Sequence, residues 1–199
     1  AGVAALVAAI VMGPRQGFPS QPMPPNNMTM TITGAGLLWV GWFGFNAGSA
    51  LAANGDAGMA MLVTHISASA GALTWVVCEG SKFGRPSALG AVTGMVAGLG
   101  TITPASGFVG PGGALVIGIS AGFVCYNATV FLKQKLKIDD SLDVFPVHGV
   151  GGLLGTLLAA VFASDALGVF SGQGLGGVSI GEQLYVQVIG VVATGLYTA

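Results

Sequence analysis

Residues 139–155 read DDSLDVFPVHGVGGLLG, and this stretch indicates the class of fold. It opens with acidic residues, and the apolar segment after them runs to about Phe162, long enough to cross a bilayer core at about 1.5 Å per residue. One ionisable side chain, His148, lies inside that segment. Because a titratable group at membrane depth is costly, His148 is a candidate functional residue. The alternative is a core histidine that hydrogen-bonds to a neighbouring carbonyl.

The residues around His148 carry further signals. Asp140, Val144 and His148 are spaced i, i+4, i+8, which predicts that they share one helical face. Pro146 is expected to kink the helix because it lacks a backbone donor. Small residues let another backbone approach closely in a membrane, and here they are Gly149, Gly151, Gly152 and Gly155. The same spacing of small residues recurs at Gly90, Gly94 and Gly98, and at Gly118 and Gly122.

Two motifs resemble one known family. DVFPVHGVGG (143–152) resembles the motif of the Amt/Mep/Rh ammonium transporters that carries the second of a pair of pore histidines. GWFGFNAGSA (41–50) looks like the same family's signature for the helix with an inner gating phenylalanine. Both are closer to the Amt branch than to the gas channels of the Rh branch. The resemblance covers essentially the whole chain and implies an all-α integral membrane protein, part of an eleven-helix fold built from two inverted repeats.

Composition independently indicates a membrane protein. Apolar residues make up 53% of the chain, charged residues 7%, and the mean hydropathy is +0.82. Soluble domains carry roughly 25% charged residues. The chain lacks the polarity of a disordered protein and the basic patch of a nucleic-acid-binding protein. Cys78 and Cys125 fall in apolar segments, so we expect them to pack rather than to form a disulfide.

Apolar segments predict one half-helix and six membrane spans. The half-helix covers 1–12, and the spans cover 28–50, 57–78, 86–103, 110–132, 141–162 and 181–199. Gly13-Pro14-Arg15 is expected to end the first helix, and the proline-rich residues 16–27 to form a loop. Since the chain starts and stops within helices, we expect an internal fragment of a longer protein. The resemblance places the first pore histidine just upstream of residue 1.

Basic residues fall only in alternate loops of this path. They are Arg15, then Lys82 and Arg85, then Lys133, Lys135 and Lys137. The loops between them, around Asp56, 104–109 and Asp165, contain neither lysine nor arginine. Because basic loops stay in the cytoplasm, the basic side is predicted to be cytoplasmic, in a multi-pass protein of the plasma membrane.

One stripe of the 28–50 helix is a candidate pore lining. Leu38, Trp42, Phe45 and Ser49 are spaced i, i+4, i+7, i+11 and share a face. Such a stripe alone is more often packing than pore. Ser49 adds a polar residue at the outer end, and Gly44 leaves room beside the Phe45 ring. From outside, helix rise predicts the order Ser49, Phe45, Trp42, His148.

This order suits a substrate that is a cation outside and must lose water to cross. A hydroxyl and aromatic faces replace part of the hydration of ammonium, with a cation–π attraction of about 0.5 to 2 kcal/mol. An apolar pore beyond Phe45 penalises ions that stay charged. Ammonium can give up its proton, and a neutral histidine such as His148 can relay it or hydrogen-bond ammonia. The resemblance thus implies ammonium or ammonia transport for nitrogen uptake, with Phe45 as gate and Ser49 as recruitment site.

Four other polar residues are weighed separately. Asp140 and Asp143 match acidic positions of the family motif, which implies that they lie in a cytoplasmic vestibule. A structural role is sufficient to explain Asp140, because a negative charge at a helix N-terminus is stabilised by the helix dipole by about 0.3 to 1 kcal/mol. His65 is expected to make an interhelical hydrogen bond, and Asn46 to cap or cross-bridge helices. A zinc site is not expected, because the histidines and cysteines show no ligand spacing.

The resemblance also bears on partners and rivals. It implies a homotrimer with one pore per subunit in the lipid bilayer, and a PII-type cytoplasmic regulator. The main rival is an ammonium sensor that uses the same pore as a ligand site. No cofactor is expected. Enzyme activity is not expected either, because no nucleophile is paired with a base.

Overall fold

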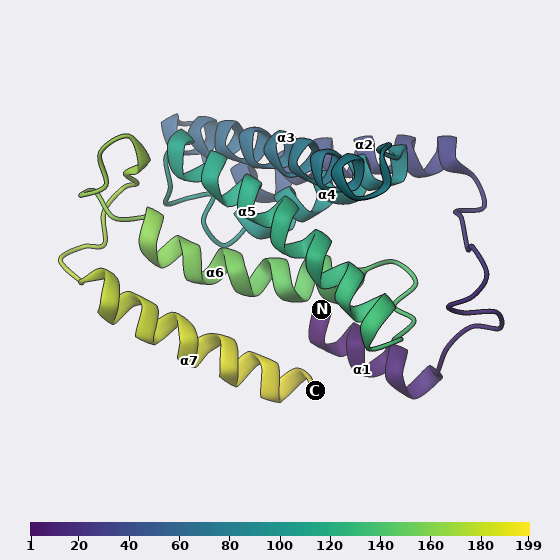
Figure 1. Cartoon of the computed structure of the whole chain (residues 1–199). Helices are drawn as coiled ribbons and strands as arrows, with labels where there is room; N and C mark the ends of the chain where they lie inside the picture. Colours follow the sequence, from purple (N-terminus) through teal and green to yellow (C-terminus); the bar gives the residue numbers. More distant parts are fainter.

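The computed structural model describes residues 1–199, and helices account for nearly all of its regular structure (Figure 1). The α-helices are α1 (Gly2–Met12), α2 (Met28–Gly48), α3 (Gly55–Phe83), α4 (Ala88–Ile102), α5 (Pro111–Val130), α6 (Gly151–Phe162) and α7 (Ile180–Thr198). Three short turns of other helix types are η1 (Phe131–Lys135) after α5, η2 (Phe145–Val150) before α6 and η3 (Gly168–Phe170) before α7. The chain has no strand, so the predicted all-α class is confirmed.

Polar side chains at the helix starts fix where the helices begin. The side chains of Asn27, Asn54 and Ser87 accept backbone N–H groups in the first turns of α2, α3 and α4. Ser179 starts α7 with a capping box. Gly84, in the left-handed conformation, ends α3.

By length and composition, the stretches that could cross a membrane are Met28–Gly48, Gly55–Phe83, Pro111–Lys135 and Phe145–Phe162.

The helix bounds differ from the predicted spans mainly at three places. α3 continues five residues past the predicted end at 78. α4 has only 15 residues, fewer than the predicted span over 86–103. The helix of His148 begins near Phe145 rather than at 141.

Glycines bring α3, α4 and α5 into close contact. A side-chain carbon on Gly98 of α4 would collide with the carbonyl of Ser67 on α3, and one on Gly118 of α5 would meet that same oxygen. Gly122 of α5 lies against the carbonyl of Gly71, also on α3. The small-residue spacings therefore mark helix contacts, as predicted.

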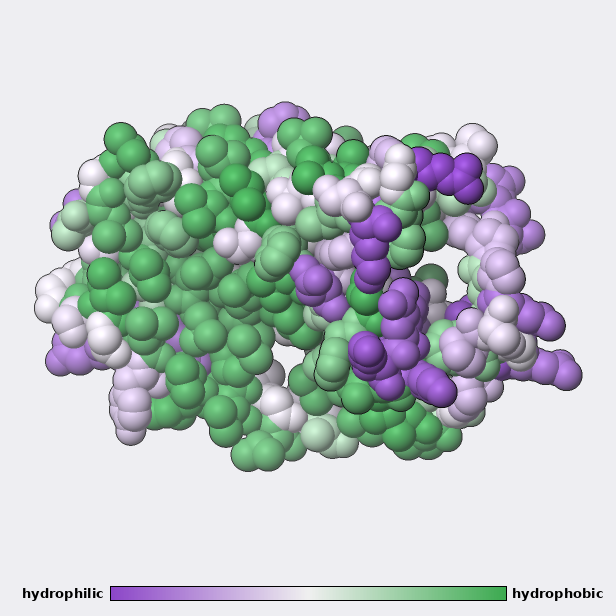
Figure 2. All heavy atoms as spheres, in the orientation of Figure 1, coloured by the Kyte–Doolittle hydropathy of each residue, from purple (hydrophilic) through white to green (hydrophobic).

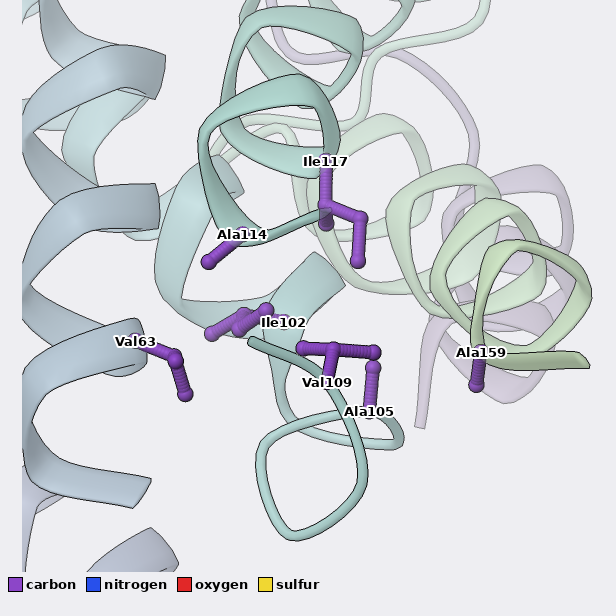
Figure 3. Close-up of a cluster of buried hydrophobic side chains, with 7 residues drawn as sticks. All are labelled: Val63, Ile102, Ala105, Val109, Ala114, Ile117 and Ala159. Carbon is purple, nitrogen blue, oxygen red and sulfur yellow. The ribbon is translucent and has the colours of Figure 1, made fainter. Parts of the chain in front are cut away.

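Around these contacts the interior is apolar. Figure 3 shows a buried cluster from α3, α4 with its following loop, α5 and α6: Val63, Ile102, Ala105, Val109, Ala114, Ile117 and Ala159. Cys125 belongs to a second cluster, and it and Cys78 are free thiols, which confirms their packing role.

The basic residues gather at one end of the bundle. Arg15, after α1, binds Asp139, before η2, and Lys82 at the end of α3 lies 5.9 Å from the ring centroid of Tyr126 at the end of α5. In Figure 2, hydrophilic residues concentrate toward the right of the view, where α1 and α5 end. We call this the basic end.

Candidate functional site

Two cavities lie on either side of the α2 stripe. The basic-end cavity, of about 990 Å³, is lined by residues that include Arg15, Leu38, Lys133, Asp143 and His148. The opposite-end cavity, of about 490 Å³, is lined by residues that include Phe45, Asn46, Ser49, Asp56 and Thr103. In the predicted stripe, Leu38 therefore lines the basic-end cavity and Phe45 lines the opposite-end cavity.

Trp42 lies between the two cavities. Its indole is nearly parallel to the His148 ring, with 6.4 Å between centroids and 9° between planes. It meets the Phe45 ring edge-on, at 6.1 Å and 72°. Phe45, Trp42 and His148 thus form a ring layer in the order that the sequence predicts, from the opposite end toward the basic end.

Two contacts hold this layer in place. The Trp42 indole Nε1–H donates to Thr103 Oγ1 over 2.8 Å. Thr103 directly follows α4, and its own hydroxyl donates to the carbonyl of Leu99 over 2.8 Å. A hydroxyl that donates in one direction keeps its lone pairs for acceptance in another, so Thr103 can fix the indole. On the other side, Gly100 lies against the imidazole of His148, where a side-chain carbon would stand 3.7 Å from Nδ1.

The start of the His148 helix corrects two predictions. Pro146 lies in the first turn, where its missing N–H removes no intrahelical bond, so the expected kink is wrong. Asp140 precedes the helix and its Oδ2 accepts the Phe145 N–H over 2.7 Å. It caps the helix instead of sharing its face, which agrees with the structural interpretation of this residue.

Val144 also departs from its predicted place. Residues 145–150 form a π turn, so the backbone around His148 is not a regular α-helix. Val147, not Val144, lines the basic-end cavity together with His148.

Ion pairs organise the mouth of the basic-end cavity. Asp139 accepts from Arg15 at three points: its Oδ1 from Nη2 over 2.7 Å, and its Oδ2 from Nε and from the backbone N, each over 2.8 Å. The guanidinium holds the pKa of the Asp139 carboxyl below its usual value and its own pKa is raised in turn. Lys133 Nζ lies 2.6 Å from Asp143 Oδ1, so Asp143 reaches the cavity wall as half of an ion pair.

At the opposite end, Ser49 presents an oxygen rather than a proton. Its hydroxyl donates to the Phe45 carbonyl over 2.7 Å, which leaves the lone pairs of the oxygen available to a cation. The neighbouring Asn46 is buried, and its Nδ2 donates to Thr64 Oγ1 on α3 over 3.0 Å. Asn46 therefore cross-bridges α2 and α3, one of the two roles expected for it.

His65 lies away from both cavities. Its ring stacks on Trp39 at 5.1 Å and contacts Phe43 at 6.1 Å, and it makes no hydrogen bond. The expected interhelical hydrogen bond is wrong, because the partners that α2 offers at this position are aromatic faces.

Comparison with known proteins decides the family. Residues 1–199 match the model of the Ammonium Transporter Family over their whole length. The chain belongs to this family. The resemblance of the two motifs is thereby confirmed.

Related ammonium transporters come from several organisms. A putative ammonium transporter of Methanothermobacter thermautotrophicus is 47% identical over 199 residues, which cover 99% of this chain and 48% of that protein. Ammonium transporter Amt1 of Archaeoglobus fulgidus is 45% identical over 196 residues, 98% of this chain and 49% of that protein. The chain thus spans about half the length of the curated relatives it matches.

Solved structures of the family share the fold. Mep2 of Saccharomyces cerevisiae matches with a TM-score of 0.86 and 37% identity, over 99% of this chain and 47% of that one. A protein described as a Sensor Amt Protein matches with a TM-score of 0.88 and 32% identity, over 99% of this chain and 49% of that one.

Within this chain, sequence reasoning missed two residues that line the cavities. Thr103 is 61 residues from Trp42, and no local spacing links them. Val147 directly precedes His148, whereas the i, i+4 spacing pointed to Val144.

Proposed function

We propose that the whole protein moves ammonium, or ammonia derived from it, across the plasma membrane through the ring layer. The observation that carries this proposal is the position of Phe45, Trp42 and His148 between two cavities that are lined by residues from opposite ends of α2. Family membership supports the substrate, because the related proteins are named as ammonium transporters.

The opposite-end cavity suits the arrival of a cation. The Ser49 oxygen has free lone pairs, and Phe45 is 62% exposed. Asp56 adds a negative charge to the same lining. These groups replace part of the hydration of ammonium, with cation–π attraction of about 0.5 to 2 kcal/mol. We therefore assign recruitment to Ser49 and occlusion to Phe45.

Beyond Phe45 the path discriminates by proton loss. Moving an ion out of water costs several kcal/mol even after relaxation, and potassium has no way to become neutral. Ammonium can leave its proton behind. His148 can accept that proton or hydrogen-bond ammonia, and its ring lies nearly parallel to the Trp42 indole. Leu38 and Val147 continue the wall toward the basic end.

A sensor that uses the same site as a ligand pocket is the second candidate. The structural similarity to a protein described as a Sensor Amt Protein favours keeping it. The two functions separate in one measurement: a transporter carries ammonium in proteoliposomes without other proteins, whereas a pure sensor binds ammonium there without flux.

Three further proposals follow from the family resemblance. The protein forms a homotrimer with one pore in each subunit, and the basic end faces the cytoplasm. A PII-type regulator binds at that end. The position of Arg15, Lys82 and Lys133 at one end of the bundle supports this orientation.

The test substitutes His148 in the full-length protein reconstituted into liposomes. His148→Ala and His148→Glu should abolish ammonium flux or remove its discrimination against potassium, because the proton acceptor is lost or becomes an anion. Ammonium uptake and charge movement are measured together. His65→Ala is the matched control, since this second histidine stacks on Trp39 away from both cavities and should leave flux unchanged. Normal flux and selectivity per inserted His148 variant would refute the role.

A further inference from the structure

A third cavity, of about 190 Å³, lies between α3, α4 and α5 near the basic end. We call it the side chamber, and its lining includes Trp75, Glu79, Tyr126, Thr129, Lys133 and Asp143. Lys133 and Asp143, which form an ion pair, also line the basic-end cavity. The pair therefore stands where the side chamber adjoins the larger cavity.

Two hydroxyl groups in the chamber wall have no partner in the protein. Tyr126 is 6% exposed, and its hydroxyl is buried without a hydrogen bond. Thr129 Oγ1 is likewise buried and unbonded, although a helical threonine normally donates to the carbonyl four residues earlier. Thr93 and Thr103 make that bond. Since a buried polar group without a partner destabilises the fold, these two hydroxyls point to an occupant of the chamber.

The charge of the lining favours a cation. Glu79 accepts only from the neutral Ser87, through its backbone N–H at 2.8 Å and its hydroxyl at 2.9 Å. Its carboxylate reaches this place because Gly90 has no side chain; a carbon there would collide with both carboxylate oxygens. Asp143 is balanced by Lys133. Glu79 is therefore the carboxylate of the chamber wall without a cationic partner.

We infer that the side chamber binds a monovalent cation of the size of potassium or ammonium. Carboxylate and hydroxyl oxygens are the ligands that hard cations prefer, and the ring of Tyr126, edge-on to Trp75 at 5.4 Å, adds an aromatic wall. The lining has two carboxylates and no histidine or cysteine, which is too few ligands for a typical divalent site. Lys82 is outside this lining and exposed to solvent, and its Nζ lies 5.4 Å from the Phe83 centroid and 5.9 Å from the Tyr126 centroid, so the Tyr126 ring already lies near one cation of the protein. The site is separate from the ring layer and does not depend on transport.

Thallium(I) is the probe, because it resembles both ions in size and scatters anomalously. Crystals of the full-length protein are soaked in thallium nitrate, and an anomalous peak is expected between Glu79, Tyr126 and Thr129. Back-soaks in potassium nitrate and in ammonium nitrate identify which ion displaces the thallium. Ordered water without an anomalous peak in the wild-type chamber would overturn the inference.

Variants test the ligands within the same crystals. Glu79→Gln should weaken thallium binding by about tenfold or more, because a charged contact is replaced by a neutral one of the same shape. Thr129→Val should also reduce the peak. Thr156→Val is the matched control, since its hydroxyl donates to the Gly152 carbonyl over 2.8 Å and lies outside the chamber. Unchanged thallium binding in both chamber variants would also refute the site.

Discussion

Replacing Thr103 with valine tests whether the ring layer is held by one hydrogen bond. Valine is close to threonine in volume but lacks Oγ1, the acceptor that lies 2.8 Å from Trp42 Nε1. Interhelical hydrogen bonds in membranes contribute about 0.6 kcal/mol on average, and ordinary protein hydrogen bonds up to about 1.5 kcal/mol. Losing that amount should lower the population of the observed indole orientation relative to others by about 3- to 12-fold.

The functional consequence follows from what the indole contacts. In any other orientation, Trp42 leaves the face of His148 and the edge of Phe45, and the partition between the cavities opens. Thr103→Val should therefore reduce selectivity for ammonium over potassium by a factor of at most about 3 to 12. The amount of protein inserted in the membrane should change little. The assay measures ammonium and potassium currents across liposomes that contain equal amounts of each variant.

Thr103→Ser is the matched control because it keeps the hydroxyl and removes only a methyl group. It should retain wild-type selectivity. Equal loss of selectivity in both variants would mean that packing around residue 103 matters and the hydrogen bond does not. A crystal structure of Thr103→Val with the Trp42 indole unmoved and selectivity unchanged would refute the reasoning altogether.

Three other predictions concern the rest of the chain. The ion pair with Arg15 lowers the pKa of Asp139, so this carboxylate stabilises the fold above its unfolded-state pKa, and the contribution is lost as pH falls through the lower folded-state pKa. Asp139→Asn should therefore make the melting temperature less dependent on pH below about pH 4. Cysteine at Gln134 should react with reagents from the cytoplasm and cysteine at Ala166 from outside, whereas labelling from one side would contradict the topology. Gly155→Ala should destabilise the detergent-solubilised protein, because the added carbon meets a backbone carbonyl, while Gly152→Ala, with open space, should not.

Much of the fold was predictable because its signals are local. Low charge and long apolar runs indicate membrane helices, and α2 begins at Met28, where the predicted span begins. Small residues every fourth position, as at Gly94 and Gly98, mark contacts because close backbone approach depends on the absence of a side chain. The order of Phe45, Trp42 and His148 followed from helix rise together with the orientation that the basic loops predict.

The predictions failed where geometry depends on turns or on distant partners. The predicted helix of His148 begins too early, at 141. In the structure Asp143, at a φ of 55°, interrupts the chain there, and the Asp140 side chain caps a helix that begins near Phe145. The basic-end cavity is lined by Val147 rather than by Val144. Helical periodicity does not contain the position of the break or of the cap, because both precede the helix.

The two cavities change how ion rejection is distributed along the proposed pore. An ion pays for desolvation only where water cannot follow it, and the cavities bring solvent-accessible space to Phe45 on one side and to His148 on the other. The stretch between them consists of the ring layer, with neighbouring centroids 6.1 and 6.4 Å apart. Rejection of potassium should therefore depend on this one layer rather than on a long apolar tube. Leu38, which faces the basic-end cavity, should consequently affect selectivity much less than Trp42 does, although both belong to the same stripe of α2.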